Sequence, residues 1–143
     1  MTDYCEVSDI EAWFPGIKFS SETKATLTWV GNLISRHSAT IDGRLYAKYT
    51  VPITGSTALA IVQEICEFLV IADVDEVMNT GIGRGTETSP AVDYRDLANK
   101  KLDKLESGEL VLIDGSTSTS NDFANYNEDN SIDPIIERDK TQW

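Results

Sequence analysis

Few side chains in this 143-residue chain are of the types that carry out catalysis. His37 is the only histidine, and it falls on the apolar stripe of an expected helix, where a hydrogen-bonded structural histidine is a better interpretation than a general acid or base. Cys5 and Cys66 are the only cysteines, they lie far apart in the chain, and neither belongs to a Cys-x-x-Cys pair or a Cys/His cluster. We therefore expect Cys66 to be a small buried hydrophobic side chain, with no disulfide scaffold.

Two further patterns suggest ligand sites but do not meet the requirements of those sites. The glycine-rich run 81–86 (GIGRGT) lacks the Lys-Ser/Thr pair of a phosphate-binding loop and follows an expected helix, where that loop would follow a strand. The acidic runs 73–76 and 127–133 lack the glycine and glutamate that a calcium-binding EF-hand loop needs at its sixth and twelfth positions. The sequence therefore predicts no catalytic residue, cofactor or metal site, and we do not expect an enzyme.

Composition limits the classes of partner. The chain has 24 acidic and 12 basic residues, a net charge of −12, which opposes binding to nucleic-acid phosphates and to anionic membranes. An acidic surface can still serve near DNA, because it repels the phosphate backbone and keeps a channel from adhering to it. The start of the chain has no signal-peptide pattern, and the most apolar segment is interrupted by Glu64, Glu67 and Asp73, so we expect neither export nor a membrane span. The expected location is the cytoplasm, a reducing compartment.

The elements that position these residues are mostly helices. A capping box formed by Ser8 and Glu11 predicts a short helix that ends at Pro15-Gly16. Apolar spacing of three and four predicts longer helices over about 23–46, 58–79 and 92–107, and Gly108 is a natural helix end. Residues 109–114 (ELVLID) are expected to form a short strand. The fold class is all-α: a small bundle of about four helices with a short strand and an extended C-terminal arm.

The apolar faces predict which positions are buried. The second helix should bury one face, the third should be central and touched from several sides, and the last should bury a narrower stripe. These positions are Val30, Leu33, Ile34, His37, Ile41 and Leu45 in the second helix, Ile65 and its apolar neighbours in the third, and Tyr94, Leu97, Ala98, Leu102 and Leu105 in the last.

The composition changes after Ile113. We divide the chain into a helical domain, 1–113, and an extended polar arm, 114–143. The arm ends in large apolar residues within a charged frame, each of which gains about 1.5–3 kcal/mol on burial. These side chains are the candidate partner-docking residues: Ile132, Pro134, Ile135, Ile136 and Trp143. The arm either docks on another subunit or partner, or folds back on its own domain, and the sequence does not decide between the two.

Four segments, taken in order, resemble the small head–tail connector (head-completion or adaptor) proteins of tailed phages. They are 4–16 (YCEVSDIEAWFPG), 41–54 (IDGRLYAKYTVPIT), 104–113 (KLESGELVLI) and the tail ending in Trp143. The resemblance implies a structural protein of the virion neck, assembled as a ring, commonly twelvefold, beneath the portal vertex, and located in the host cytoplasm during assembly. Its implied partners are the portal protein, a stopper or tail-completion protein, further copies of itself, and DNA that passes through the channel without specific binding.

A second interpretation belongs to a different class of protein. The acidic charge and the polar arm also fit an acidic regulatory protein, such as an antitoxin or a DNA-mimic inhibitor, that acts on a host or phage partner. Such a protein need not form rings and would be absent from virus particles.

Overall fold

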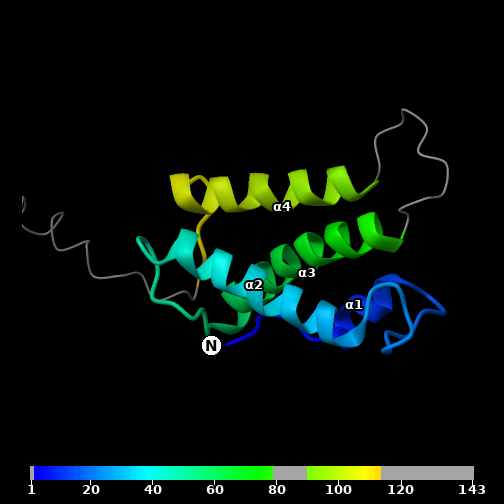
Figure 1. The fold of residues 1–143 in the computed structure, drawn as a ribbon. Helices are drawn as coiled ribbons and strands as arrows, with labels where there is room; N and C mark the ends of the chain where they lie inside the picture. The colour runs from blue at the N-terminus through cyan, green and yellow to red at the C-terminus, as the bar shows by residue number, and fades with distance from the viewer. Residues whose placement is uncertain (1, 79–89, 114–143) are drawn as a thin grey trace, which may run out of the picture.

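A computed structural model describes residues 2–78 and 90–113, and these residues form four helices (Figure 1). They are α1 (Val7–Trp13), α2 (Leu27–Leu45), α3 (Ser56–Met78) and α4 (Pro90–Ser107). The prediction of an all-α fold with about four helices is confirmed. None of these helices has the length and apolar content needed to cross a membrane.

The central element is α3. It contacts α1, α2 and α4, and in Figure 1 it lies between α2 and α4 and runs opposite in direction to both. Because three neighbours cover it, its apolar residues are not confined to one stripe, as the sequence predicts. Its buried residues are Ala58, Val62, Ile65, Cys66, Phe68, Leu69, Val70, Ile71, Ala72 and Val74.

The predicted start of α2 at about residue 23 is wrong. The helix begins at Leu27, and Thr26 is its N-cap, with a side chain that accepts a hydrogen bond from the Trp29 backbone N–H at 3.2 Å. Thr23 instead donates to the backbone carbonyl oxygens of Ser20 and Ala25, and so builds the turn that precedes the helix. Several hydroxyl residues in this stretch could cap a helix, and only the tertiary structure selects one.

The predicted cap of α1 also differs. Glu6, not Ser8, is the N-cap residue, and its backbone N–H donates to the Asp9 carboxylate at 2.8 Å. Glu11 is not part of a capping box, since its carboxylate accepts from the Phe19 backbone N–H at 3.0 Å and so holds the chain that follows the helix. The helix ends at Trp13, and Gly16 then takes a φ of 82°, as the Pro-Gly stop predicts.

The predicted strand at 109–114 is wrong over the residues that the structure describes. Residues 110–113 form no strand, and Leu112 is buried while Val111 and Ile113 are exposed. The Leu112 backbone N–H donates to the Tyr49 hydroxyl at 3.4 Å, so the segment packs on side chains and not on a neighbouring strand. An irregular extended segment that packs on helices alternates buried and exposed residues just as an edge strand does.

The end of α4 matches its prediction. Gly108 has a φ of 85°, a left-handed conformation, and the Leu110 backbone N–H returns to the Lys104 carbonyl oxygen at 3.0 Å. Lys48, which follows α2, donates to the Glu106 carbonyl oxygen at 2.9 Å. The C-terminal ends of α2 and α4 are thereby held together.

Candidate interaction surface

Three aromatic rings from three helices meet at the surface. Trp13 of α1, Phe68 of α3 and Tyr94 of α4 have ring centroids 5.5–6.0 Å apart, and Trp13 packs edge-on against the other two. Phe68 is buried, whereas Trp13 is 43 % exposed. Leu97 lies three residues after Tyr94 on the same side of α4 and is 47 % exposed. We call these four residues the Trp13 patch.

Charged side chains border the Trp13 patch. The Trp13 indole N–H donates to the Glu67 carboxylate at 3.2 Å. Lys101 lies 5.5 Å from the centre of the Phe68 ring, and its ammonium group pairs with Glu64 at 2.5 Å. An apolar centre with aromatic rings and a charged rim is the usual composition of a protein–protein interface.

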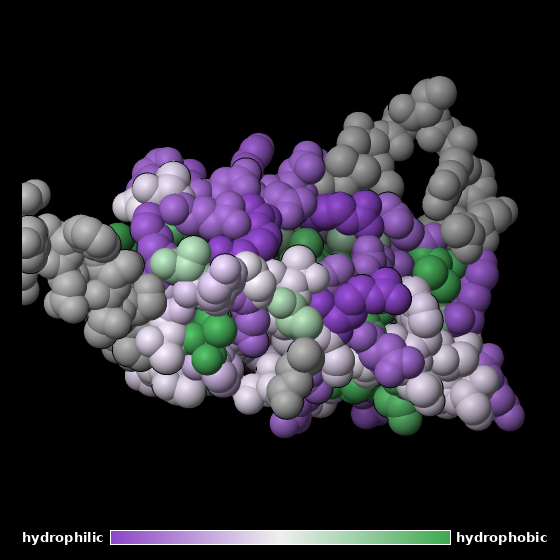
Figure 2. Space-filling model, turned by 60° about the vertical axis from the view of Figure 1, so that its left-hand side comes forward, coloured by the Kyte–Doolittle hydropathy of each residue, from purple (hydrophilic) through white to green (hydrophobic). Residues whose placement is uncertain are grey.

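The wider surface is mixed in character. On the face drawn in Figure 2, hydrophilic side chains gather over the upper part, where α4 lies, and hydrophobic side chains form separate patches among them. A second group of exposed apolar residues lies at the C-terminal ends of α2 and α4. Its members are Tyr46, Val111 and Ile113, which are 67 %, 55 % and 79 % exposed.

A polar network joins the three long helices. His37 of α2 lies 2.7 Å from one carboxylate oxygen of Asp73 of α3, and Arg95 of α4 donates to the other at 2.7 Å. Arg95 also pairs with Glu76 at 2.9 Å. Burial alone raises the pKa of Asp73, but the hydrogen bonds from His37 and Arg95 outweigh it and leave the pKa below its usual value. His37 thus ties α2 to α3.

A second ionic cluster fixes α2 against α4. Arg44 donates to both oxygens of the Glu106 carboxylate, at 2.8 and 2.7 Å, and to Asp103 at 2.6 Å. The hydrogen bonds from Arg44 lower the pKa of Glu106. This bidentate geometry sets the relative position of the two helix ends more firmly than a single contact would.

The N-terminal segment enters the core at Tyr4 and Cys5. Tyr4 is buried, its backbone N–H donates to the Ser38 hydroxyl at 3.0 Å, and its own hydroxyl donates to Asp42 and accepts from the Ile53 backbone N–H. Burial, with the hydrogen bond to Asp42, raises the pKa of Tyr4. Ser38 and Asp42 are one turn apart on α2, so they present both partners to the same inserted residue.

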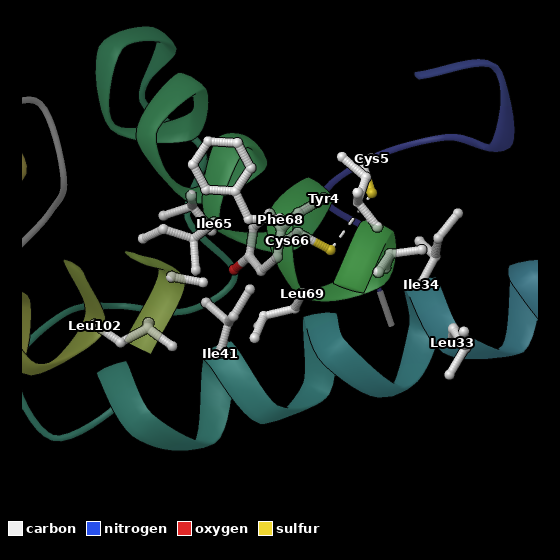
Figure 3. Packing of buried hydrophobic residues seen from close by; sticks show 14 of the residues in the cluster. Tyr4, Cys5, Leu33, Ile34, Ile41, Ile65, Cys66, Phe68, Leu69 and Leu102 are labelled. Atoms are coloured by element: carbon white, nitrogen blue, oxygen red, sulfur yellow. Dashed lines mark hydrogen bonds between the residues drawn. The ribbon is translucent and has the colours of Figure 1, made fainter. Parts of the chain in front are cut away.

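Cys5 follows Tyr4 into the core and meets Cys66. The two sulfur atoms are 3.4 Å apart and both side chains are buried, as Figure 3 shows among the surrounding apolar residues. Cys66 is buried as predicted. Its contact with Cys5 was not predicted, because separation in the sequence says nothing about distance in the fold.

The predicted docking residues are not placed by the structure. Ile132, Pro134, Ile135, Ile136 and Trp143 lie outside the described residues, as does the whole arm, 114–143. The Trp13 patch was not predicted, and Leu97, which was assigned to the buried stripe of the last helix, is half exposed. The signal that could have identified the Trp13 patch is the spacing of Tyr94, Leu97 and Lys101, which share one side of α4.

Neither metal-site geometry in the described residues nor similarity to a known protein assigns a function to this chain. Over residues 2–78 and 90–113, no three His, Cys, Asp or Glu side chains lie close enough together to hold a metal ion. No family model, no curated protein and no solved structure matches this chain.

Proposed function

We propose that this protein is a structural component of a tailed-phage virion, a head–tail connector that forms a ring beneath the portal vertex and is not an enzyme. The order of the four segments that resemble this family supports the proposal, and so does the helical body in which three of them lie. The ring would extend the DNA channel, join the head to the tail, and contact the portal protein on one side and a stopper or tail-completion protein on the other.

The observation that carries the proposal is the Trp13 patch. A half-exposed tryptophan and leucine beside two further aromatic rings lose contact with water when a partner covers them. Tryptophan and tyrosine are enriched among the few residues that contribute most of the energy in protein interfaces. The charged rim of Glu64, Glu67 and Lys101 supplies polar contacts around that centre. A second copy of the chain is the partner that a ring requires.

The charge and the arm are compatible with this role. A net charge of −12 would let DNA move past the ring without adhering to it. The arm, at about 3.3 Å per extended residue, has a reach of roughly 90 Å, enough to contact a neighbouring subunit or the portal. Such an arm would lose its conformational entropy only when it docks, which makes docking conditional on assembly.

The first test is the number of copies per particle. Quantitative mass spectrometry of purified virions from the source phage should find about a dozen copies, as a single cyclic ring at one vertex requires. Absence from the particle would reject the proposal and favour the acidic regulatory protein, which the same net charge would suit. A count in the hundreds would reject it in favour of a capsid or tail-tube protein.

A substitution in the Trp13 patch tests the interface itself. Leu97→Glu adds a charge at a half-exposed position, so the monomer should fold while the number of copies per particle falls at least tenfold, because a charge buried at an interface is costly. Asn32→Glu adds the same charge at an exposed position of α2 and serves as the control, with an unchanged copy number expected. Equal incorporation of both variants would exclude the Trp13 patch as a subunit contact.

A further inference from the structure

The pairing of Cys5 with Cys66 places two thiols where a bond between them is within reach. Their sulfur atoms are 3.4 Å apart, and a disulfide requires about 2.05 Å, so closure needs a movement of little more than an ångström. Figure 3 shows the two side chains pointing toward one another, Cys5 from the N-terminal segment and Cys66 from α3. Neither thiol is engaged in a disulfide.

Cys5 can make the required movement more easily than Cys66 can. Cys66 lies in the middle of α3, where helical hydrogen bonds and neighbouring helices fix the backbone. Cys5 lies just before α1, in a segment without regular secondary structure, so its backbone can shift without breaking a helix. The two contacts that flank it, Tyr4 to Ser38 and Glu6 to Asp9, would guide Cys5 without preventing the shift.

The surroundings of the two thiols differ. Cys5 donates its S–H to Cys66, and the Ser38 hydroxyl lies 3.7 Å from the Cys66 sulfur. The hydrogen bond from Cys5 lowers the pKa of the Cys66 thiol in spite of its burial, while the same bond and burial raise the pKa of Cys5. While the segment is docked, the thiolate form is therefore favoured at Cys66 over Cys5, and a thiolate is the nucleophile in disulfide chemistry.

We propose that Cys5 and Cys66 form a reversible disulfide by exchange with a low-molecular-weight disulfide, and that this bond fastens the N-terminal segment covalently to α3. The inference goes beyond the proposed function and is independent of it, since it concerns a modification site inside a single subunit.

The reaction balances in two steps. When the N-terminal segment opens locally, Cys5 leaves both its hydrogen bond to Cys66 and the core, so its thiol can lose its proton to solvent. The Cys5 thiolate then attacks one sulfur of the small disulfide, whose S–S bond breaks and releases one thiolate. As the segment returns, the Cys66 thiolate attacks the Cys5 sulfur, the mixed disulfide breaks, and a second small thiolate leaves. The two protein thiols give up two protons and two electrons; the small disulfide takes up both electrons, and the two thiolates that it releases take up both protons and become thiols.

The test uses the full-length protein. The reduced protein is held in native buffer with excess oxidised glutathione, and its intact mass, free thiols and Tm are measured. We expect a loss of two hydrogens, no free thiols, a peptide that links Cys5 to Cys66, and a rise in Tm on the order of 10 °C because the bond closes a long loop. Dithiothreitol should restore the starting mass and Tm.

Four outcomes of this experiment would contradict the proposal. Two thiols that persist at equilibrium, a stable glutathione adduct, or a disulfide-linked dimer would each overturn it, as would a Cys5–Cys66 bond that forms only in denaturant. Cys5→Ala is the matched control, because it leaves Cys66 in place and should show neither the loss of two hydrogens nor the rise in Tm. The copy number in virions does not affect any of these results.

Discussion

At the scale of single residues, Asp73 is where three helices converge. Its carboxylate contacts His37 of α2 and Arg95 of α4, and its pKa lies below the usual 3.8. A carboxyl group whose pKa is lower in the folded than in the unfolded state stabilises the fold at every pH above its unfolded value. That stabilisation is lost as the pH falls through the folded pKa.

Asp73→Asn should therefore change how the free energy of unfolding depends on pH under acidic conditions. We expect the variant to be less stable at pH 7 by about 1–3 kcal/mol, since charge-assisted hydrogen bonds to His37 and Arg95 are weakened. Below pH 4 its free energy of unfolding should fall less steeply than that of the wild type. Urea unfolding between pH 7 and pH 2.5 measures both effects, and parallel curves would show that Asp73 is not a source of the acid sensitivity.

Two glycines provide an opposed pair of substitutions. Gly108 has a φ of 85°, and an added Cβ would lie 2.7 Å from the Lys48 ammonium nitrogen, so Gly108→Ala should cost about 1–2 kcal/mol and loosen the contact of Lys48 with Glu106. Gly43 lies inside α2 with open space around it, so Gly43→Ala should stabilise the protein by up to about 1 kcal/mol. Thermal unfolding of both variants measures whether each substitution raises or lowers the stability. Two changes of the same sign would contradict the different roles given to Gly108 and Gly43.

At the scale of elements, the inserted N-terminal segment contributes stability through the Tyr4 hydroxyl. Tyr4→Phe removes the donor to Asp42 and the acceptor for the Ile53 N–H, and leaves a buried N–H without its partner. We expect a loss of about 1–3 kcal/mol and faster amide exchange over residues 2–6.

Tyr46→Phe is the matched control for that substitution. It removes the same hydroxyl from a side chain that is 67 % exposed, so its effect should stay within about 0.5 kcal/mol. If the two variants lose equal stability, the Tyr4 hydrogen bonds do not hold the segment in place.

The elements themselves follow from apolar periodicity, whereas their ends do not. The third and fourth helices are predicted to within two residues because long repeats of three and four leave one consistent interpretation. The start of α2 and the cap of α1 are wrong because Thr23, Thr26, Ser8 and Glu6 are all competent at a helix end. Local hydrogen bonds made in the folded chain decide among them, and these cannot be read from spacing alone.

The candidate sites were harder to predict than the helices. The Trp13 patch draws its rings from α1, α3 and α4, and the contact of Cys5 with Cys66 joins the N-terminal segment to α3. Each depends on how the helices pack, and side chains distant in sequence carry no shared local pattern. The half exposure of Leu97 arises in the same way, because it lies at the edge of the buried stripe of α4, where coverage depends on the neighbouring helix.

At the scale of the whole molecule, the arm and the helical domain should be separable. Deletion of Pro134–Trp143 removes Pro134, Ile135, Ile136 and Trp143 from a segment outside the described residues. If the arm docks on another subunit or on the portal, the truncated protein should keep the Tm and helical circular dichroism of the full chain yet fail to join particles. Loss of the folded domain on truncation would mean that the arm packs on its own subunit.

The inserted Tyr4 and Cys5 also bear on the order in which the chain can fold. Both precede α2 and α3 in the chain, so they leave the ribosome before the helices that enclose them. Their partners Ser38, Ile53 and Cys66 are synthesised later, so the segment has nowhere to dock until α3 has emerged. A part of the chain that is made first thus docks only after α3 has been made, and its docking shows that α2 and α3 have paired.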